Sequence, residues 1–361
     1  MKELSHFKEQ INKCSKCGLC QSVCPIYKIT GNECAVSKGK FVMLDGVIKG
    51  NLKLNKNINK YLEMCLKCGK CSDFCPSGID VCKIFSTAKY DYINNHIEGF
   101  LIKLFQSKFI FDSILNIADR INFLRIPQKR YSSNKNIMFF KGCANKVFPS
   151  GEKGLRRILS KLDYNLITTN FQCCGVPFLS SGNLKRYRDA IKHNSEIINN
   201  CAHDFILTDC ASCEDALKHY PELNKKILSA DEFLAENNVK FSFKNYKKIT
   251  FHKPCHMKNY ENITKIFNNC RNIEYIEMKD FDECCGFAGQ FALTNRKLST
   301  DLSKQKAKNA IDTNADIIIT TCPACILGLK QGLLQLKSTA SSKPKVMTLS
   351  EFLSNADTIN I

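Results

Sequence analysis

The sequence predicts an α+β multidomain protein, in which a helical, cysteine-rich N-terminal domain precedes two copies of an α/β domain with a parallel sheet. Three observations support this prediction. Two tracts near the N-terminus share one cysteine spacing, the rest of the chain repeats itself after about 112 residues, and each repeat alternates short apolar strands with helical segments. Strands that alternate with helices in this way form a parallel sheet with helices on its faces.

The two N-terminal tracts have the spacing of ferredoxin-type domains that hold two cubane [4Fe–4S] clusters. They read Cys14-x2-Cys17-x2-Cys20-x3-Cys24-Pro25 and Cys65-x2-Cys68-x2-Cys71-x3-Cys75-Pro76. In such domains the first three cysteines of a tract bind one cluster and the fourth binds the other. We therefore predict a helical, two-[4Fe–4S] ferredoxin-like domain over residues 1–95. The expected ligands are Cys14, Cys17, Cys20 and Cys75 for the first cubane, and Cys65, Cys68, Cys71 and Cys24 for the second.

Structural zinc is the alternative for these tracts, but it needs only pairs of Cys-x2-Cys and leaves the fourth cysteines and their prolines unexplained. Between the tracts, helical pieces are expected around Phe41–Leu44 and Ile58–Met64. Helices there would wrap the clusters and keep water away from them.

Residues 96–133 form a separate segment whose apolar residues recur at helical spacing up to Pro127. We favour a helical hairpin that packs on its own domain. The alternative is a docking face for a membrane or a partner subunit.

The remainder of the chain is a duplication. Cys255 follows Cys143 by 112 residues, Cys284 follows Cys173 by 111, and Cys322 follows Cys210 by 112. Apolar strands over Lys135–Phe140 and Tyr246–Phe251 each run into the first cysteine of a copy. The copies are expected over residues 134–245 and 246–361, facing each other about a pseudo-twofold axis. Helices are expected over Gly154–Leu162, Tyr187–Asn199, Leu298–Asp312 and Ile326–Leu336.

Each copy supplies five cysteines, which is one more than a cubane needs. Ligands gather at the carboxyl ends of parallel strands, where these cysteines are expected. An adjacent Cys-Cys pair suits a polynuclear site better than a single tetrahedral ion, because neighbouring side chains diverge. Zinc in one copy remains the alternative. The two sets are Cys143, Cys173, Cys174, Cys210 and Cys213, and Cys255, Cys284, Cys285, Cys322 and Cys325.

The pattern Cys-x(~30)-Cys-Cys-Gly-x(~36)-Cys-x2-Cys resembles the cysteine-rich (CCG) domain of heterodisulfide reductase catalytic subunits. With the two-cluster unit before it, the chain resembles the iron–sulfur subunit of glycolate oxidase, related lactate and glycerol-3-phosphate dehydrogenase subunits, and the heterodisulfide reductase-like proteins that join the same two parts. Matching phrases include Phe74-Cys-Pro-Ser-Gly78, His252-Lys-Pro-Cys-His256 and Cys284-Cys-Gly-Phe-Ala-Gly289. The resemblance covers nearly the whole chain except residues 96–133.

The resemblance implies an iron–sulfur electron-transfer subunit with two cubane clusters and one or two further non-cubane [4Fe–4S] clusters, each held by one five-cysteine set. A separate FAD-containing dehydrogenase would oxidise a 2-hydroxy acid such as glycolate or D-lactate, and this chain would relay electrons toward the quinone pool. In the heterodisulfide reductases such domains cleave a disulfide instead. Both five-cysteine motifs are complete here, as in those enzymes, so whether the chain is itself an enzyme stays open.

Composition limits the other functions. The formal charge of +19 invites a nucleic-acid or zinc-scaffold hypothesis, but each cubane with four thiolates carries about −2, and the lysines are spread along the chain. No dinucleotide or phosphate-loop glycine motif is present, so an organic redox cofactor must sit on another chain. No nucleic-acid partner is expected. A membrane surface or a quinone-reducing partner is the second possibility for the basic charge.

The 22 cysteines indicate a reducing compartment, and the N-terminus lacks a secretory signal. We expect a cytoplasmic protein, with the inner face of the cytoplasmic membrane as the alternative location. Four cysteines outside the motifs, Cys34, Cys82, Cys201 and Cys270, are expected to be small buried hydrophobes. For His252 and His256, which flank Cys255, packing or a hydrogen bond to a cluster sulfur is favoured over a role as metal ligands.

Overall fold

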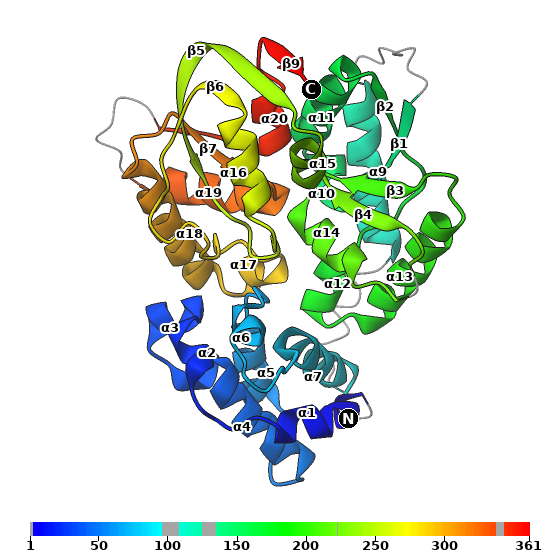
Figure 1. The fold of residues 1–361 in the computed structure, drawn as a ribbon. Helices are drawn as coiled ribbons and strands as arrows, with labels where there is room; N and C mark the ends of the chain where they lie inside the picture. Colours follow the sequence, from blue (N-terminus) through cyan, green and yellow to red (C-terminus); the bar gives the residue numbers. More distant parts are fainter. Residues whose placement is uncertain (1–2, 96–107, 125–134, 222, 337–342) are drawn as a thin grey trace. The chain divides into compact units, whose positions relative to one another are not determined.

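The computed structural model describes residues 3–95, 108–124, 135–221, 223–336 and 343–361 (Figure 1). Contacts divide the chain into two compact units. The N-terminal unit comprises Met1–Phe111, Pro177–Arg188 and Cys284–Ser303. The double-sheet unit comprises Asp112–Val176, Asp189–Glu283 and Lys304–Ile361. The α+β multidomain prediction is confirmed: helices dominate the first unit, and the second contains two parallel sheets.

Short helices build the N-terminal unit around one apolar core. Leu44, Leu62 and Phe85 are among its fully buried side chains. The predicted helical pieces around Phe41–Leu44 and Ile58–Met64 lie in α4 and α5. Helix α4 (Ser37–Ile48) extends beyond the predicted piece at both ends. The elements are η1 (Leu4–Phe7), α1 (Lys8–Asn12), α2 (Leu19–Ser22), α3 (Pro25–Thr30), η2 (Glu33–Ala35), α4 (Ser37–Ile48), α5 (Lys56–Glu63), α6 (Lys70–Asp73) and α7 (Val81–Asn95).

Two later segments also belong to the N-terminal unit, which the sequence did not predict: Pro177–Arg188 follows the first Cys-Cys-Gly motif, and Cys284–Ser303 begins with the second. They carry most of α12 (Val176–Ser181), α17 (Gln290–Thr294) and the first parts of α13 (Leu184–Asn199) and α18 (Arg296–Ile311). The Lys89 ammonium donates to the Ser180 carbonyl (3.3 Å), and the Asn295 amide donates to the Glu63 carbonyl (3.0 Å). These bonds join the segments to α7 and α5 of the N-terminal unit.

The double-sheet unit contains two sheets of the same topology, as the duplication predicts. The first has the order β2-β1-β3-β4 and the second the order β6-β5-β7-β8, with all these pairs parallel. Strand β9 adds antiparallel to β5. The strands are β1 (Lys135–Phe139), β2 (Tyr164–Ile167), β3 (Phe205–Thr208), β4 (Lys226–Ser229), β5 (Lys240–Phe251), β6 (Cys270–Tyr275), β7 (Ile317–Thr320), β8 (Lys345–Thr348) and β9 (Thr358–Asn360).

In both copies, helices alternate with the strands along the chain (Figure 1). The four helices that the sequence predicts in the copies are present as α11, α13, α18 and α19. Strand β5 is longer than expected and begins before the predicted division between the copies. The helices of this unit are α10 (Cys143–Val147), α11 (Ser150–Lys161), α14 (Ala211–Lys218), α15 (Ala230–Glu236), α16 (Glu261–Asn268), α19 (Pro323–Gln335) and α20 (Leu349–Leu353), with most of α13 and part of α18.

The two copies pack reciprocally. Helix α11 of the first copy contacts α20 of the second, and α15 of the first copy contacts α16 of the second. Helix α16 of the second copy corresponds to α11 of the first, and α20 corresponds to α15. Each of the two contacts is therefore the symmetry counterpart of the other, as a two-fold relation requires. One apolar cluster, which includes Phe139, Leu155, Phe251 and Phe352, runs through both copies.

Helix α9 (Lys108–Leu124) is the described part of segment 96–133, and the rest of the predicted hairpin lies outside the described residues. Its Asp119 carboxylate pairs with the Lys141 ammonium at 2.6 Å, and the Asn122 amide donates to the Lys146 carbonyl at 2.8 Å. Ile117 and Ile121 remain exposed. These two contacts lie within the double-sheet unit, and the choice between packing and a docking face stays a prediction. No helix in the described ranges combines the length and apolar character needed to span a membrane.

Candidate metal centres

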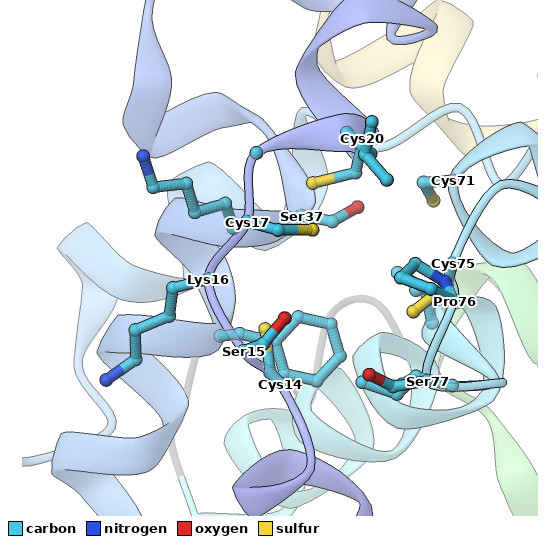
Figure 2. Close-up of a pocket in the computed structure, with 16 residues that line it drawn as sticks. Cys14, Ser15, Lys16, Cys17, Cys20, Ser37, Cys71, Cys75, Pro76 and Ser77 are labelled. Atoms are coloured by element: carbon cyan, nitrogen blue, oxygen red, sulfur yellow. The ribbon is translucent and has the colours of Figure 1, made fainter.

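The first group of motif cysteines lines a pocket in the N-terminal unit (Figure 2). Cys14, Cys17, Cys20 and Cys75 surround it, and Cys71 lies at its edge. Four of these five are the cysteines that the sequence assigns to one cubane. The sulfur atoms of Cys17, Cys20 and Cys75 point toward the space between the two tracts, which come from opposite sides of the pocket.

A second pocket collects the other set. It is lined by Cys24 from the first tract, by Cys65, Cys68 and Cys71 from the second, and by Cys82. The fourth cysteine of each tract thus lies with the first three of the other tract, which is the exchange that the Cys-Pro spacing predicts. Cys71 lines both pockets, so the pockets are neighbours.

The same backbone turn presents the cysteines in both tracts. Lys16 and Lys67 have φ of 58° and 56°, and Gly18 and Gly69 have φ of 87° and 78°. Two left-handed residues so close together curl the chain, so that the three cysteines of a tract face one space. Glycine suits the second position, because it adopts a left-handed conformation at little cost.

The electrostatics of these thiols favour a bound cation. Burial raises the pKa of the Cys20, Cys24 and Cys71 thiols, so these groups would stay protonated unless a positive centre binds them. Closely packed, buried sulfur atoms fit a metal-bound state, since metal ligation stabilises thiolates. The donor set therefore fits iron–sulfur clusters.

The first five-cysteine motif is brought together at the carboxyl ends of β1, β2 and β3. Cys143 begins α10, Cys210 is the N-cap of α14, and Cys213 lies in its first turn. Cys173 and Cys174 lie in the loop after β2. The Sγ atoms of Cys143 and Cys173 are 3.3 Å apart.

Hydrogen bonds join these five thiols into one buried group. Bonds from the Cys173 and Cys213 thiols lower the pKa of Cys174 to about 5. The same network, with burial, raises the pKa of Cys143 well above its usual range. A Cβ atom at Gly142 would lie 2.7 Å from Cys213 Sγ, so only glycine allows the backbone this close to the sulfurs. Protonated neighbouring thiols stabilise one deprotonated thiol in this group, and a bound polynuclear metal centre would take the place of their protons.

Two residues that the sequence analysis missed hold the Cys-Cys loop. The Tyr220 hydroxyl donates to the Cys174 carbonyl (2.9 Å), and the Asn194 amide donates to the Cys173 carbonyl (3.2 Å). Asn194 also accepts from the Gln172 N–H at 3.0 Å. No local pattern marks either residue, because each lies on an element distant in sequence from the loop it supports.

The cysteines of the second motif belong to different units of the chain, and each group is described within its own unit. Cys255, Cys322 and Cys325 belong to the double-sheet unit, and Cys284 and Cys285 belong to the N-terminal unit. The Ser303 hydroxyl donates to the Cys285 carbonyl (2.8 Å), and the Ser299 hydroxyl donates to the Gly286 carbonyl (2.9 Å). Serines of α18 therefore support this loop, in place of the asparagine and tyrosine of the first copy.

His252 is fully buried beside the second motif. One of its ring nitrogens lies within 4.8 Å of Cys325 Sγ. Among the described residues neither ring nitrogen has a hydrogen-bond partner, and burial lowers the pKa of this imidazole well below its usual range. A neutral ring with unpartnered nitrogens fits a group bound there, by hydrogen bond or as a ligand. His256 instead approaches Asp215, with Nδ1 3.6 Å from the carboxylate.

The cysteines of the two copies meet inside the double-sheet unit. The Cys210 and Cys322 thiols hydrogen-bond to each other, which lowers the pKa of Cys322. Nearby, the Ala211 N–H donates to the Thr321 carbonyl (3.0 Å). The reciprocal bond cannot form, since Pro323 occupies the position equivalent to Ala211 and has no N–H.

The four remaining cysteines differ in burial. Cys34 is exposed, so the expectation of a buried hydrophobe was wrong there. Cys82, Cys201 and Cys270 are half-buried. Cys270 donates to the Ile266 carbonyl, and burial raises its pKa to about 12.

Comparisons with known proteins agree with this organisation. Residues 10–79 match the model of the 4Fe-4S dicluster domain, and residues 137–218 and 249–330 match that of the cysteine-rich domain. A dihydromethanophenazine:CoB–CoM heterodisulfide reductase subunit of Methanosarcina acetivorans is 23% identical over 95% of this chain and 94% of its own length. A fumarate reductase (CoM/CoB) subunit of Methanothermobacter marburgensis is 27% identical over 96% of this chain and 73% of its own. The probable glycolate oxidase iron–sulfur subunit of Bacillus subtilis is 21% identical over 99% and 97%.

Proposed function

Because the chain belongs to the family of iron–sulfur electron-transfer subunits that includes those of heterodisulfide reductase and glycolate oxidase, we propose that it relays electrons from a flavin-dependent 2-hydroxy-acid dehydrogenase toward the quinone pool. The observation that carries the proposal is the exchange of the fourth cysteine between the two N-terminal pockets. That exchange is expected of a chain that holds two clusters close enough for electrons to pass between them.

The cysteines would be used in four sets. Cys14, Cys17, Cys20 and Cys75 would hold one cubane, and Cys24, Cys65, Cys68 and Cys71 the other. The five cysteines of each duplicated motif would hold a further, non-cubane cluster. When bound, these clusters supply one-electron redox chemistry.

The chain's own residues would position the clusters and keep water from them. The left-handed turns at Gly18 and Gly69 aim the cysteines inward. The buried sulfurs of Cys173, Cys174, Cys210 and Cys213 lie in a region with little access to solvent. Exclusion of water and a set of fixed hydrogen bonds tune such sites.

A partner subunit supplies the substrate chemistry in this proposal. Relatives of this chain are named as subunits of larger enzymes, and the sequence has no dinucleotide-binding glycine motif. The partner would be an FAD-containing dehydrogenase of glycolate or D-lactate. The complex would work in the cytoplasm, at the inner face of the cytoplasmic membrane where a quinone is reduced.

Anaerobic co-purification tests this proposal. The tagged chain is isolated with the products of the neighbouring genes, its iron is measured, and glycolate or D-lactate is added while cluster absorbance is followed. We expect a flavoprotein in the complex and bleaching of the cluster absorbance by one of the hydroxy acids. A chain that holds no iron, or whose clusters no hydroxy acid reduces through any co-purified protein, would refute it.

Disulfide reduction is the second candidate function. It is favoured by the two complete five-cysteine motifs and by the contact between Cys210 and Cys322, which places cysteines of both motifs together. One relative is named as part of a heterodisulfide reductase. Adding candidate thiols to the oxidised protein should then produce a new paramagnetic signal. Thiols that leave the spectrum unchanged would remove this candidate.

A further inference from the structure

Lys40 and Lys70 line the second N-terminal pocket, and the charges of Lys67 and Lys89 reach its Cys65; Lys40 and Lys89 are buried. Lys40 on α4 lines the pocket and is 2% exposed, and Lys89 on α7 is 4% exposed. Lys67 lies in the second tract itself. The ammonium groups of Lys40 and Lys67 lie 5.4 and 5.5 Å from the centre of the Phe85 ring.

Lys40 and Lys89 are not balanced by a contacting carboxylate among the described residues. Lys89 donates to the Ser180 carbonyl at 3.3 Å, and the Glu63 carboxylate acts on it only from a distance. Lys40 contacts the face of Phe85. Buried charges are costly unless an opposite charge offsets them, so these lysines indicate a negative group in the pocket.

The sulfurs of the pocket respond to these charges. The positive charges of Lys40, Lys67 and Lys89 all act on the Cys65 sulfur, which lines this pocket. The lysines thus stabilise negative charge at the second pocket.

The first pocket has no equivalent among the described residues. Its two lysines are more exposed, with side-chain exposures of 50% for Lys16 and 32% for Lys38, and each lies near a carboxylate: Lys16 is 4.0 Å from Asp45, and Lys38 is 3.9 Å from Glu33. Figure 2 shows the Lys16 side chain directed away from the cysteines. Exposed, paired charges are screened by water and contribute little.

We propose, on the basis of the proposed function, that Lys40 and Lys89, together with Lys67, make the site at Cys24, Cys65, Cys68 and Cys71 the more easily reduced of the two N-terminal sites. Reduction adds one negative charge to the bound group. Buried positive charges stabilise that added charge more than exposed ones do, because the interior screens them less. Electrons that enter this domain would therefore collect at the second site.

A potentiometric titration of the full, anaerobically purified chain, followed by electron paramagnetic resonance, tests the inference. The wild-type protein should show two separate cubane steps. Lys40→Met and Lys89→Met should each lower the reduction potential of the higher step by at least about 59 mV, which is a tenfold change in its one-electron equilibrium constant. The potential of the lower step should stay unchanged. Cys17→Ala, which removes a cysteine of the first pocket, should alter the lower step only.

Two further variants separate charge from packing. Lys40→Arg keeps the charge and should retain the higher step, whereas Lys49→Met removes an exposed lysine that pairs with Asp45 and lines neither pocket, and should move neither step. The inference is overturned if both cubane steps of the wild type coincide, or if Lys89→Met leaves the higher step unchanged while iron is retained. These two results decide the question even where Lys40→Met fails to fold. A chain without cubane signals would instead refute the proposed function, and this inference with it.

Discussion

The contact between the two cysteine-rich copies can be tested at Gly154. This glycine lies in α11, and a Cβ atom there would lie 2.6 Å from the Ser350 carbonyl carbon and 2.8 Å from Glu351 Cα, both backbone atoms of α20. Real Cβ atoms essentially never come this close to backbone, so Gly154→Ala must push the two copies apart. Helix propensity works in the opposite direction, since alanine stabilises a helix by about 0.5–1 kcal/mol relative to glycine.

The sign follows from the two magnitudes. Overpacking against atoms that cannot rotate away costs about 1–3 kcal/mol, so the net effect should be a loss of up to about 2.5 kcal/mol. For a unit of this size each kcal/mol lost lowers the unfolding temperature by roughly 2–4 °C. The measurement is a thermal scan of the cluster-loaded protein under argon at one fixed scan rate, with iron content checked before each scan.

Gly46→Ala is the matched control. Gly46 also lies in a helix, and its Cβ would meet the Leu52 side chain, with Cδ1 at 2.8 Å. Leu52 is 45% exposed, so this side chain can move into solvent. The control should leave the unfolding temperature unchanged or slightly higher. If Gly154→Ala behaves like the control, the reciprocal packing of the copies is wrong.

Three further predictions concern other parts of the chain. Tyr220→Phe leaves the buried Cys174 carbonyl without its donor, which costs about 1–3 kcal/mol, and should speed the loss of iron to a chelator; the same change at the exposed Tyr246 should have no such effect. Burial raises the pKa of Asp231 to about 7, so the folded state holds a proton that the unfolded state has lost between pH 4 and pH 7. Asp231 alone should lower stability by about 1.4 kcal/mol per pH unit in that window, and Asp209, whose pKa burial also raises to about 7, should add a similar slope. Asp231→Asn should therefore remove about half of the slope in denaturant titrations at pH 5.5, 6.0 and 6.5, and an unchanged slope would contradict this. Asp119→Asn weakens the pair with Lys141 and should expose α9 to limited proteolysis; cleavage rates equal to wild type would contradict this.

Local rules explain why much of the organisation was predictable. Cysteine spacing within a tract reflects a loop of fixed shape, and the offset of 112 residues between Cys143 and Cys255 reflects a duplication. Alternating strands and helices imply parallel sheets. The parallel sheets, the helices of both copies and the grouping of the N-terminal cysteines into two pockets follow these patterns closely.

The features that sequence reasoning missed depend on contacts between distant segments. Nothing local shows that Ser180 would accept a hydrogen bond from Lys89, or that the segment Cys284–Ser303 would join the N-terminal unit. The sequence did not single out Lys40 either, because any one lysine in a Lys-rich chain is expected at the surface. Only its burial near the cysteines distinguishes it. Burial of a charge is a tertiary property, and a pattern of spacing does not encode it.

The duplication also conceals a difference between the two five-cysteine motifs. Tyr220 and Asn194 bond the Cys-Cys loop of the first copy, whereas serines of α18 bond that of the second. A buried neutral His252 accompanies the second motif. Because hydrogen bonds and burial around sulfur tune iron–sulfur sites, equal ligand sets in unequal surroundings should differ in potential. In the proposed relay, this difference would favour electron transfer in one direction between the two sets, which contact each other through Cys210 and Cys322.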